Sequence, residues 1–151
     1  MTGFGFAVNV QTRRFNFTEV KPHFINPCCF GEDFAAWLAA ELAPLGADGF
    51  VISQPIQEDY GWGIWVTRAK TRIWIALSSL QEGAESGEPP VDPSAEGEWI
   101  VSVEQDHGLN PLRRLFGGHD VAATEQVTKA VRAALDGASD ITVQPSGGSE
   151  P

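Results

Sequence analysis

Two alternating segments separated by only two residues constrain the fold of this chain more than any other feature. Residues 61–68 (GWGIWVTR) and 71–77 (TRIWIAL) alternate apolar with small or polar side chains, and only Ala69 and Lys70 separate them. A period of two indicates β-strands, and so short a loop requires an antiparallel hairpin. Because Ala-Lys suits a two-residue turn poorly, a four-residue loop with the same register is an equally good alternative.

The two faces of this hairpin differ in composition. One face is apolar enough to receive helices: Trp62, Ile64, Val66, Ile73, Ile75 and Leu77. The other mixes aromatic with small or polar residues: Gly63, Trp65, Thr67, Arg72, Trp74 and Ala76. The register sets Trp65 opposite Trp74. If other segments cover this pair, stability alone explains it, since aromatic pairs add about 0.5–1.5 kcal/mol beyond burial. The alternative is a partly open pocket or docking face.

The rest of the chain alternates between strand and helix patterns. Strands are expected at 4–11, 49–56, 98–105 and 140–144, with Phe15 and Phe17 completing a first hairpin. Helices are expected at 31–46, 110–116 and 120–137. Trp37 falls within the apolar stripe of the first helix, so we expect a core residue packed on the aliphatic hairpin face. The order predicts an α+β fold, with an antiparallel, meander-rich sheet of about five to six strands and two main α-helices packed mostly on one face.

Length and composition indicate how the chain is organised. Its 151 residues and hydrophobic fraction of 42% suit one globular domain with its own core. We assign residues 1–145 to this domain and residues 146–151 to a flexible tail. Residues 81–97 (QEGAESGEPPVDPSAEG) lack periodicity and apolar content, which predicts a mobile acidic loop.

The charge balance limits the classes of partner. The net charge is −10, with 20 acidic residues against 10 basic ones. Nucleic acids and anionic membranes require a basic surface, so neither is expected as a partner. The N-terminal residues lack the pattern of a signal peptide, and the apolar runs are shorter than the roughly 20 residues of a membrane span. We therefore expect a cytoplasmic protein whose partner is another protein, and a basic protein is one option for that partner.

The cysteines and histidines offer little specific chemistry. The spacing of His23, Cys28, Cys29, His107 and His119 matches no C-x-x-C or H-E-x-x-H motif, so no metal or cofactor is expected. Either cysteine, lying before a helix N-terminus, could act as a nucleophile with His23 as base. A thiol-dependent enzyme is the weaker alternative, because no third orienting group is identifiable. The segment 106–120 could hold an anion, but a capped short helix explains it equally well.

The segment QEDYGWG at 57–63 completes the set of candidate binding residues. Acidic and aromatic side chains that could engage a cation or a basic partner are Glu58, Asp59, Tyr60, Trp62, Trp65 and Trp74. A solvated turn is the simpler explanation for the Asp-Tyr-Gly part. We predict a non-enzymatic binding protein that engages a protein partner, as a regulator, adaptor or immunity-type protein does. The alternative is a small-molecule-binding domain with an aromatic pocket lined by Tyr60, Trp65 and Trp74.

Overall fold

The computed structural model describes residues 6–17, 19–25, 29–80, 97–106 and 121–145, and the structural statements that follow concern these ranges. The strands are β1 (Phe6–Thr12), β2 (Val51–Ile52), β3 (Ile56–Glu58), β4 (Gly61–Arg68), β5 (Thr71–Ser79), β6 (Gly97–Asp106) and β7 (Ile141–Pro145). The helices are α1 (Glu32–Leu42), a short 3-10 helix η1 (Ala43–Asp48) and α3 (Val121–Gly137).

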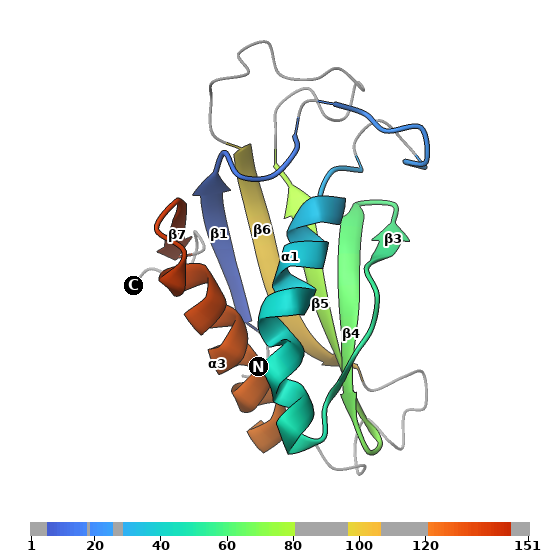
Figure 1. Ribbon diagram of the computed structural model, residues 1–151, viewed down its shortest axis with the longest axis vertical. Coiled ribbons are helices and arrows are strands. Elements are labelled where there is room, and N and C mark those ends of the chain that lie inside the picture. Colours follow the sequence, from blue (N-terminus) through green and yellow to red (C-terminus); the bar gives the residue numbers. More distant parts are fainter. Residues whose placement is uncertain (1–5, 18, 26–28, 81–96, 107–120, 146–151) are drawn as a thin grey trace.

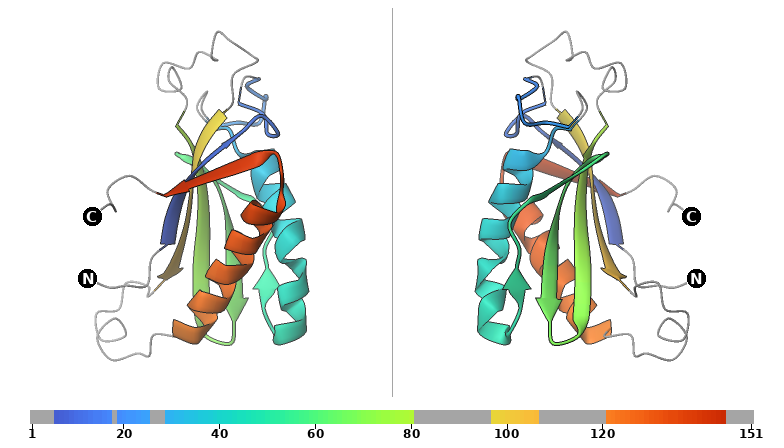
Figure 2. Two further views of the ribbon diagram at one scale, coloured as in Figure 1. Left: turned by 90° about the vertical axis from the view of Figure 1, so that its left-hand side faces the viewer. Right: turned by 90° about the vertical axis from the view of Figure 1, so that its right-hand side faces the viewer.

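The strands form one antiparallel sheet with both α-helices on the same side (Figures 1 and 2). The strand order is β2-β4-β5-β6-β1-β7, and β3 pairs with the same edge of β4 as β2. Seven strands are present, slightly more than expected, because residues 49–56 contribute two short strands instead of one. Pro55 lies between them, where a residue without an N–H can interrupt pairing. The predicted α+β architecture with helices on one face is confirmed.

The hairpin register follows the prediction. Trp65 pairs with Trp74, and the strands meet at Arg68 and Thr71. The connection is therefore the two-residue turn, not the four-residue alternative. Ala69 adopts a φ of 54°, a left-handed conformation that a non-glycine residue takes at some cost.

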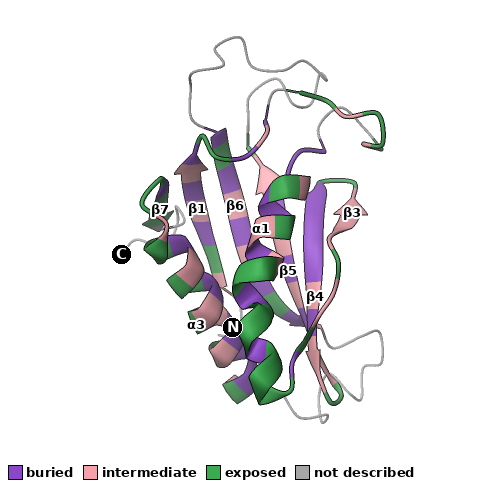
Figure 3. Ribbon diagram, in the orientation of Figure 1, coloured by how far each residue is buried: buried purple, intermediate pink, exposed green. Residues whose placement is uncertain are grey.

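The core lies between the sheet and the two helices. The aliphatic hairpin face is buried there, and so are the inward residues of β6 and the apolar stripe of α3: Trp99, Val101, Val103, Val127, Val131 and Leu135. Thr124 of α3 donates a hydrogen bond of 3.2 Å to Gln105 of β6, which fixes that helix to the sheet. The exposed residues of α1 and α3 face away from the sheet (Figure 3). Each buried large side chain contributes about 1.5–3 kcal/mol to folding.

Two predictions about aromatic residues were wrong. Phe15 and Phe17 do not form a strand that pairs with β1. The neighbours of β1 in the sheet are β6 and β7. Both phenylalanines are instead buried, and Phe15 stacks on Phe34 of α1 with ring centroids 4.3 Å apart. Trp37 is only partly buried. Its ring contacts Phe15, and Arg14 lies over it at 5.2 Å, so it covers the outer side of this stack.

Several expected segments lie outside the described residues. These are the acidic loop up to residue 96, the helix at 110–116 and the tail at 146–151. Gly97, assigned to the loop from the sequence, is the first residue of β6. None of the described helices is long and apolar enough to cross a membrane.

Candidate functional site

The sheet has a second face, on the side away from α1 and α3, that no described helix covers (Figure 2). We call it the open face. Strand alternation and the pairing of β4 with β5 place Trp65 and Trp74 there. Both indoles are partly buried, so the pair is neither core nor fully solvated. Trp65 and Trp74, with Tyr60 and Arg72, form what we call the Trp65–Trp74 cluster.

Contacts within the Trp65–Trp74 cluster fix its side chains. The two indole rings lie 4.7 Å apart at an interplanar angle of 52°. The indole N–H of Trp74 donates a hydrogen bond of 2.8 Å to the hydroxyl of Tyr60. The guanidinium of Arg72 lies 4.1 Å over the ring of Trp65 and forms an ion pair of 3.4 Å with Asp106. Every side chain of the cluster is therefore held by at least one directed contact.

Small residues beside the cluster let the Trp74 indole lie close to the sheet. Gly63 is directly beneath this indole, because a Cβ atom at position 63 would overlap Cζ2 and Cη2 of Trp74. Ala76 and Ser102 continue the row from Gly63 across β5 and β6. A larger side chain at position 63 would require the indole to move.

The open face carries more negative than positive charge. Among the described strand residues, the register places four acidic residues on this face, Glu58, Glu98, Glu104 and Asp106, against one cation, Arg72. Asp106 is paired with Arg72, and Glu98 accepts a hydrogen bond of 3.0 Å from Gln11. Among the described residues, no hydrogen bond or ion pair involves the side chain of Glu58 or Glu104. The charge of the described part of this face is therefore mainly negative.

Tyr60 joins the turn between β3 and β4 to the cluster. Its side chain is 43% exposed, yet partial burial raises the pKa of its hydroxyl above 10.0, and the nearby Glu58 carboxylate adds to the rise. The hydrogen bond from Trp74 acts in the opposite direction, because it stabilises the phenolate. At neutral pH the phenol is therefore neutral.

The structure divides the predicted binding residues into two groups. Tyr60, Trp65 and Trp74 come together on the open face, and Glu58 lies beside Tyr60 at the edge of the sheet. Asp59 is exposed in the turn that precedes Tyr60. Trp62 points to the opposite face and is only 5% exposed. Its indole N–H donates a hydrogen bond of 2.8 Å to the carbonyl of Cys29, so Trp62 belongs to the core.

Cys29 is a fully buried residue beneath the β3–β4 turn. Its thiol donates a hydrogen bond of 3.1 Å to the carbonyl oxygen of Glu58. His23, the predicted base, is exposed and lies 2.6 Å from the carboxylate of Glu32. The geometry thus assigns Cys29 to packing. Cys28 lies outside the described residues, as do His107 and His119. Within the described part of the chain, no group of three or more His, Cys, Asp or Glu residues could hold a metal ion.

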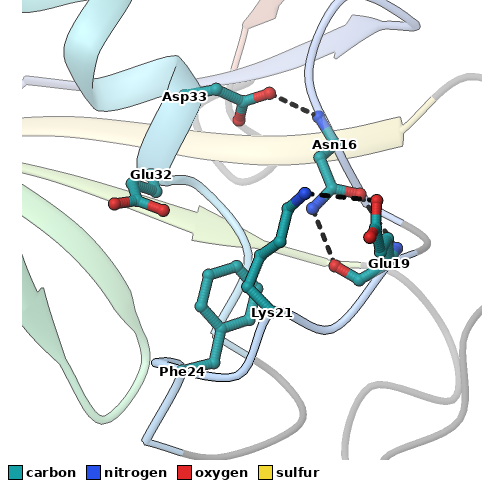
Figure 4. A pocket seen from close by; sticks show the side chains of 6 residues that line it. All are labelled: Asn16, Glu19, Lys21, Phe24, Glu32 and Asp33. Atoms are coloured by element: carbon teal, nitrogen blue, oxygen red, sulfur yellow. Dashed lines mark hydrogen bonds and ion pairs between the residues drawn. The ribbon is translucent and has the colours of Figure 1, made fainter.

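A cavity of about 250 Å³ lies near the N-terminal end of α1 (Figure 4). It is lined by Asn16, Glu19, Lys21, Phe24, Glu32 and Asp33. Its carboxylates already have partners in the chain. Lys21 pairs with Glu19 at 3.2 Å, and the backbone N–H of Asn16 donates to Asp33 at 2.8 Å. None of the predicted aromatic binding residues lines this cavity.

Two residues of the open face were missed in the sequence. Arg72 was placed on the correct hairpin face, but its stacking on Trp65 was not anticipated. Glu104 was not considered at all, although it is directly opposite Trp74 in the pairing of β5 with β6. Only the register of β6 against β5 shows that Glu104 lies beside Trp74.

Comparison with protein-family models, with curated proteins and with solved structures gave no match to this chain.

Proposed function

We propose that this protein binds another protein through the open face of its sheet, and that the Trp65–Trp74 cluster is the centre of the interface. The observation that carries the proposal is a partly exposed cluster made of two tryptophans, a tyrosine and an arginine on a face that no described helix covers. These three residue types dominate the binding energy of protein interfaces.

Charge supports a basic partner. Glu58, Glu104 and Asp106 lie next to the cluster, whose one basic residue is Arg72, and this balance suits a partner surface rich in lysine and arginine. The ordered side chains also favour binding. Since contacts within the chain already fix the indoles, docking loses less side-chain entropy than it would at a mobile surface.

The alternative function is small-molecule binding in an aromatic pocket. The cavity near α1 gives it no support, because none of Tyr60, Trp65 and Trp74 lines that cavity. A thiol-dependent reaction at Cys29 would require that buried side chain to leave its hydrogen bond with Glu58. Protein binding is the function that the geometry favours.

Site-specific photo-crosslinking in the native host tests the proposal. A photoreactive amino acid at Ser102, on the open face, should capture a basic protein. The same group at Glu41, on the exposed side of α1, provides the matched control. The captured protein, once purified, should bind the wild-type chain and bind Trp65→Ala at least tenfold more weakly, since truncating a central tryptophan commonly removes 2 kcal/mol or more, roughly 30-fold in affinity.

Capture from Glu41 alone, or equal affinity of the purified partner for the wild-type chain and Trp65→Ala, would exclude the open face as the interface. The melting temperature of Trp65→Ala must be measured alongside, so that loss of binding is compared only between folded proteins.

A further inference from the structure

The cluster has two halves, and the first already contains a cation. The guanidinium of Arg72 lies 4.1 Å over the ring of Trp65, and its charge is balanced by Asp106 at 3.4 Å. An aromatic ring, a guanidinium and a carboxylate are thus assembled from neighbouring strands. A guanidinium in this position is attracted to the face of the ring by the cation–π interaction.

The second half has a tryptophan ring and a carboxylate without a cation. Glu104 is the direct neighbour of Trp74 in the pairing of β5 with β6, which places their Cβ atoms about 4.5–5.5 Å apart. Glu58 lies on the other side of the cluster, opposite Gly61 of β4, so it adds negative charge near Tyr60 without reaching the same atoms as Glu104. Among the described residues, no cationic group lies over the Trp74 ring, and neither glutamate side chain has a hydrogen bond or ion pair.

The Trp74 half is also held in place. Its indole lies against Gly63 on one side and donates its N–H to Tyr60 at 2.8 Å. A ring fixed by these contacts keeps its orientation when another group stacks on it. A carboxylate beside a fixed aromatic surface can accept two parallel N–H bonds, so it matches a planar group with several N–H donors better than a compact ammonium.

We propose that Trp74 and Glu104 bind one arginine side chain of the protein partner, in the manner in which Trp65 and Asp106 bind Arg72 within the chain. The proposal depends on the proposed function for the source of the arginine, and it adds the chemical group that the open face recognises. The guanidinium lies over Trp74, whose orientation Tyr60 holds, and Glu104 accepts its hydrogen bonds; Glu58 adds only longer-range attraction.

Short peptides test this subsite without the partner. The probes are pentapeptides of glycine with a central arginine, citrulline or lysine, capped at both ends; citrulline keeps the shape of arginine without its charge. Binding is followed by NMR through the indole N–H signal of Trp74, assigned with Trp74→Phe. The arginine peptide should shift this signal with saturation, bind more tightly than the lysine peptide, and bind less tightly as salt increases.

Charge-neutralising variants separate the acceptor Glu104 from the longer-range attraction of Glu58. Affinity for the arginine peptide should fall about threefold in Glu104→Gln and further in the double variant with Glu58→Gln, the range expected for exposed charge pairs. Glu41→Gln removes the same charge from the exposed side of α1 and should change affinity little. Equal binding of the citrulline or lysine peptide, or an effect of Glu41→Gln as large as that of Glu104→Gln, would overturn the proposal.

The crosslinked partner separates this proposal from the proposed function. If its binding is lost in Trp65→Ala but unchanged in the double glutamate variant, the open face is the interface and the arginine subsite is wrong. If the arginine peptide binds as described but Trp65→Ala retains the partner, the subsite stands and its source must be another ligand.

Discussion

Replacing Gly63 by alanine should displace the Trp74 indole while leaving the sheet intact. The added Cβ atom would overlap Cζ2 and Cη2 of that ring. The φ of Gly63 is not positive, so alanine is compatible with the backbone itself. The clash therefore involves the far end of one side chain, and the ring can avoid it only by moving away from β4.

The cost can be worked out from the contacts that this movement breaks. The hydrogen bond from Trp74 to Tyr60 is worth about 0.5–1.5 kcal/mol. The contact between Trp74 and Trp65 adds about 0.5–1.5 kcal/mol. Replacing glycine by alanine recovers about 0.4–1 kcal/mol by restricting the unfolded chain. The midpoints of these ranges leave a net loss of about 1 kcal/mol in the free energy of unfolding.

Urea unfolding of Gly63→Ala measures this loss, and near-UV circular dichroism reports the displaced indole. Gly46→Ala is the matched control, because a Cβ atom there meets no atom within 4 Å. It should be neutral or slightly stabilising. A Gly63→Ala protein with the wild-type urea midpoint and an unchanged near-UV spectrum would show that the Trp74 ring does not lie over Gly63, and the argument for a fixed aromatic surface would fail.

Three further predictions concern single side chains. Tyr60 is the only tyrosine, so its absorbance titration in the folded protein should have a midpoint above 10.0, and Glu58→Gln should lower that midpoint. Because the folded state holds this proton more tightly, the contribution of Tyr60 to stability should be complete below pH 10.0 and decrease as the pH rises through the folded pKa. Trp62→Ala should cost about 3–5 kcal/mol in urea unfolding and Trp65→Ala clearly less, because only Trp62 is buried in the core; equal losses would contradict this division. With the other cysteine replaced by serine, Cys29 should react with a thiol reagent only as fast as the protein opens, and rapid labelling of the native state would refute its burial.

The sequence predicted the central hairpin well because its register has a local cause. Two residues between alternating strands determine which side chains oppose each other, and Trp65 and Trp74 were paired correctly for that reason. The division into a helix-facing and an open side follows from the same alternation. These features depend on neighbours in the chain.

Features that depend on distant segments could not be predicted in this way. Phe15 and Phe17 have the spacing of a strand, but their burial depends on α1, where Phe34 stacks on Phe15. Alternation already placed Trp62 on the helix-facing side of the hairpin, but its hydrogen bond to the carbonyl of Cys29, 33 residues away, could not be read from the sequence. Glu104 became part of the candidate site only because β6 pairs with β5. The local periodicity of a sequence does not determine the order of the strands in a sheet.

The internal contacts of the Trp65–Trp74 cluster bear on binding as well as on stability. Gly63 and Tyr60 fix the orientation of Trp74, and Arg72 covers Trp65. A partner that docks on such a surface meets side chains that are already ordered, so binding loses little conformational entropy. Gly63→Ala removes that order at a cost of only about 1 kcal/mol in folding. It should therefore weaken partner binding by a larger free energy than it removes from folding, because at the interface it also misplaces the ring on which the partner stacks.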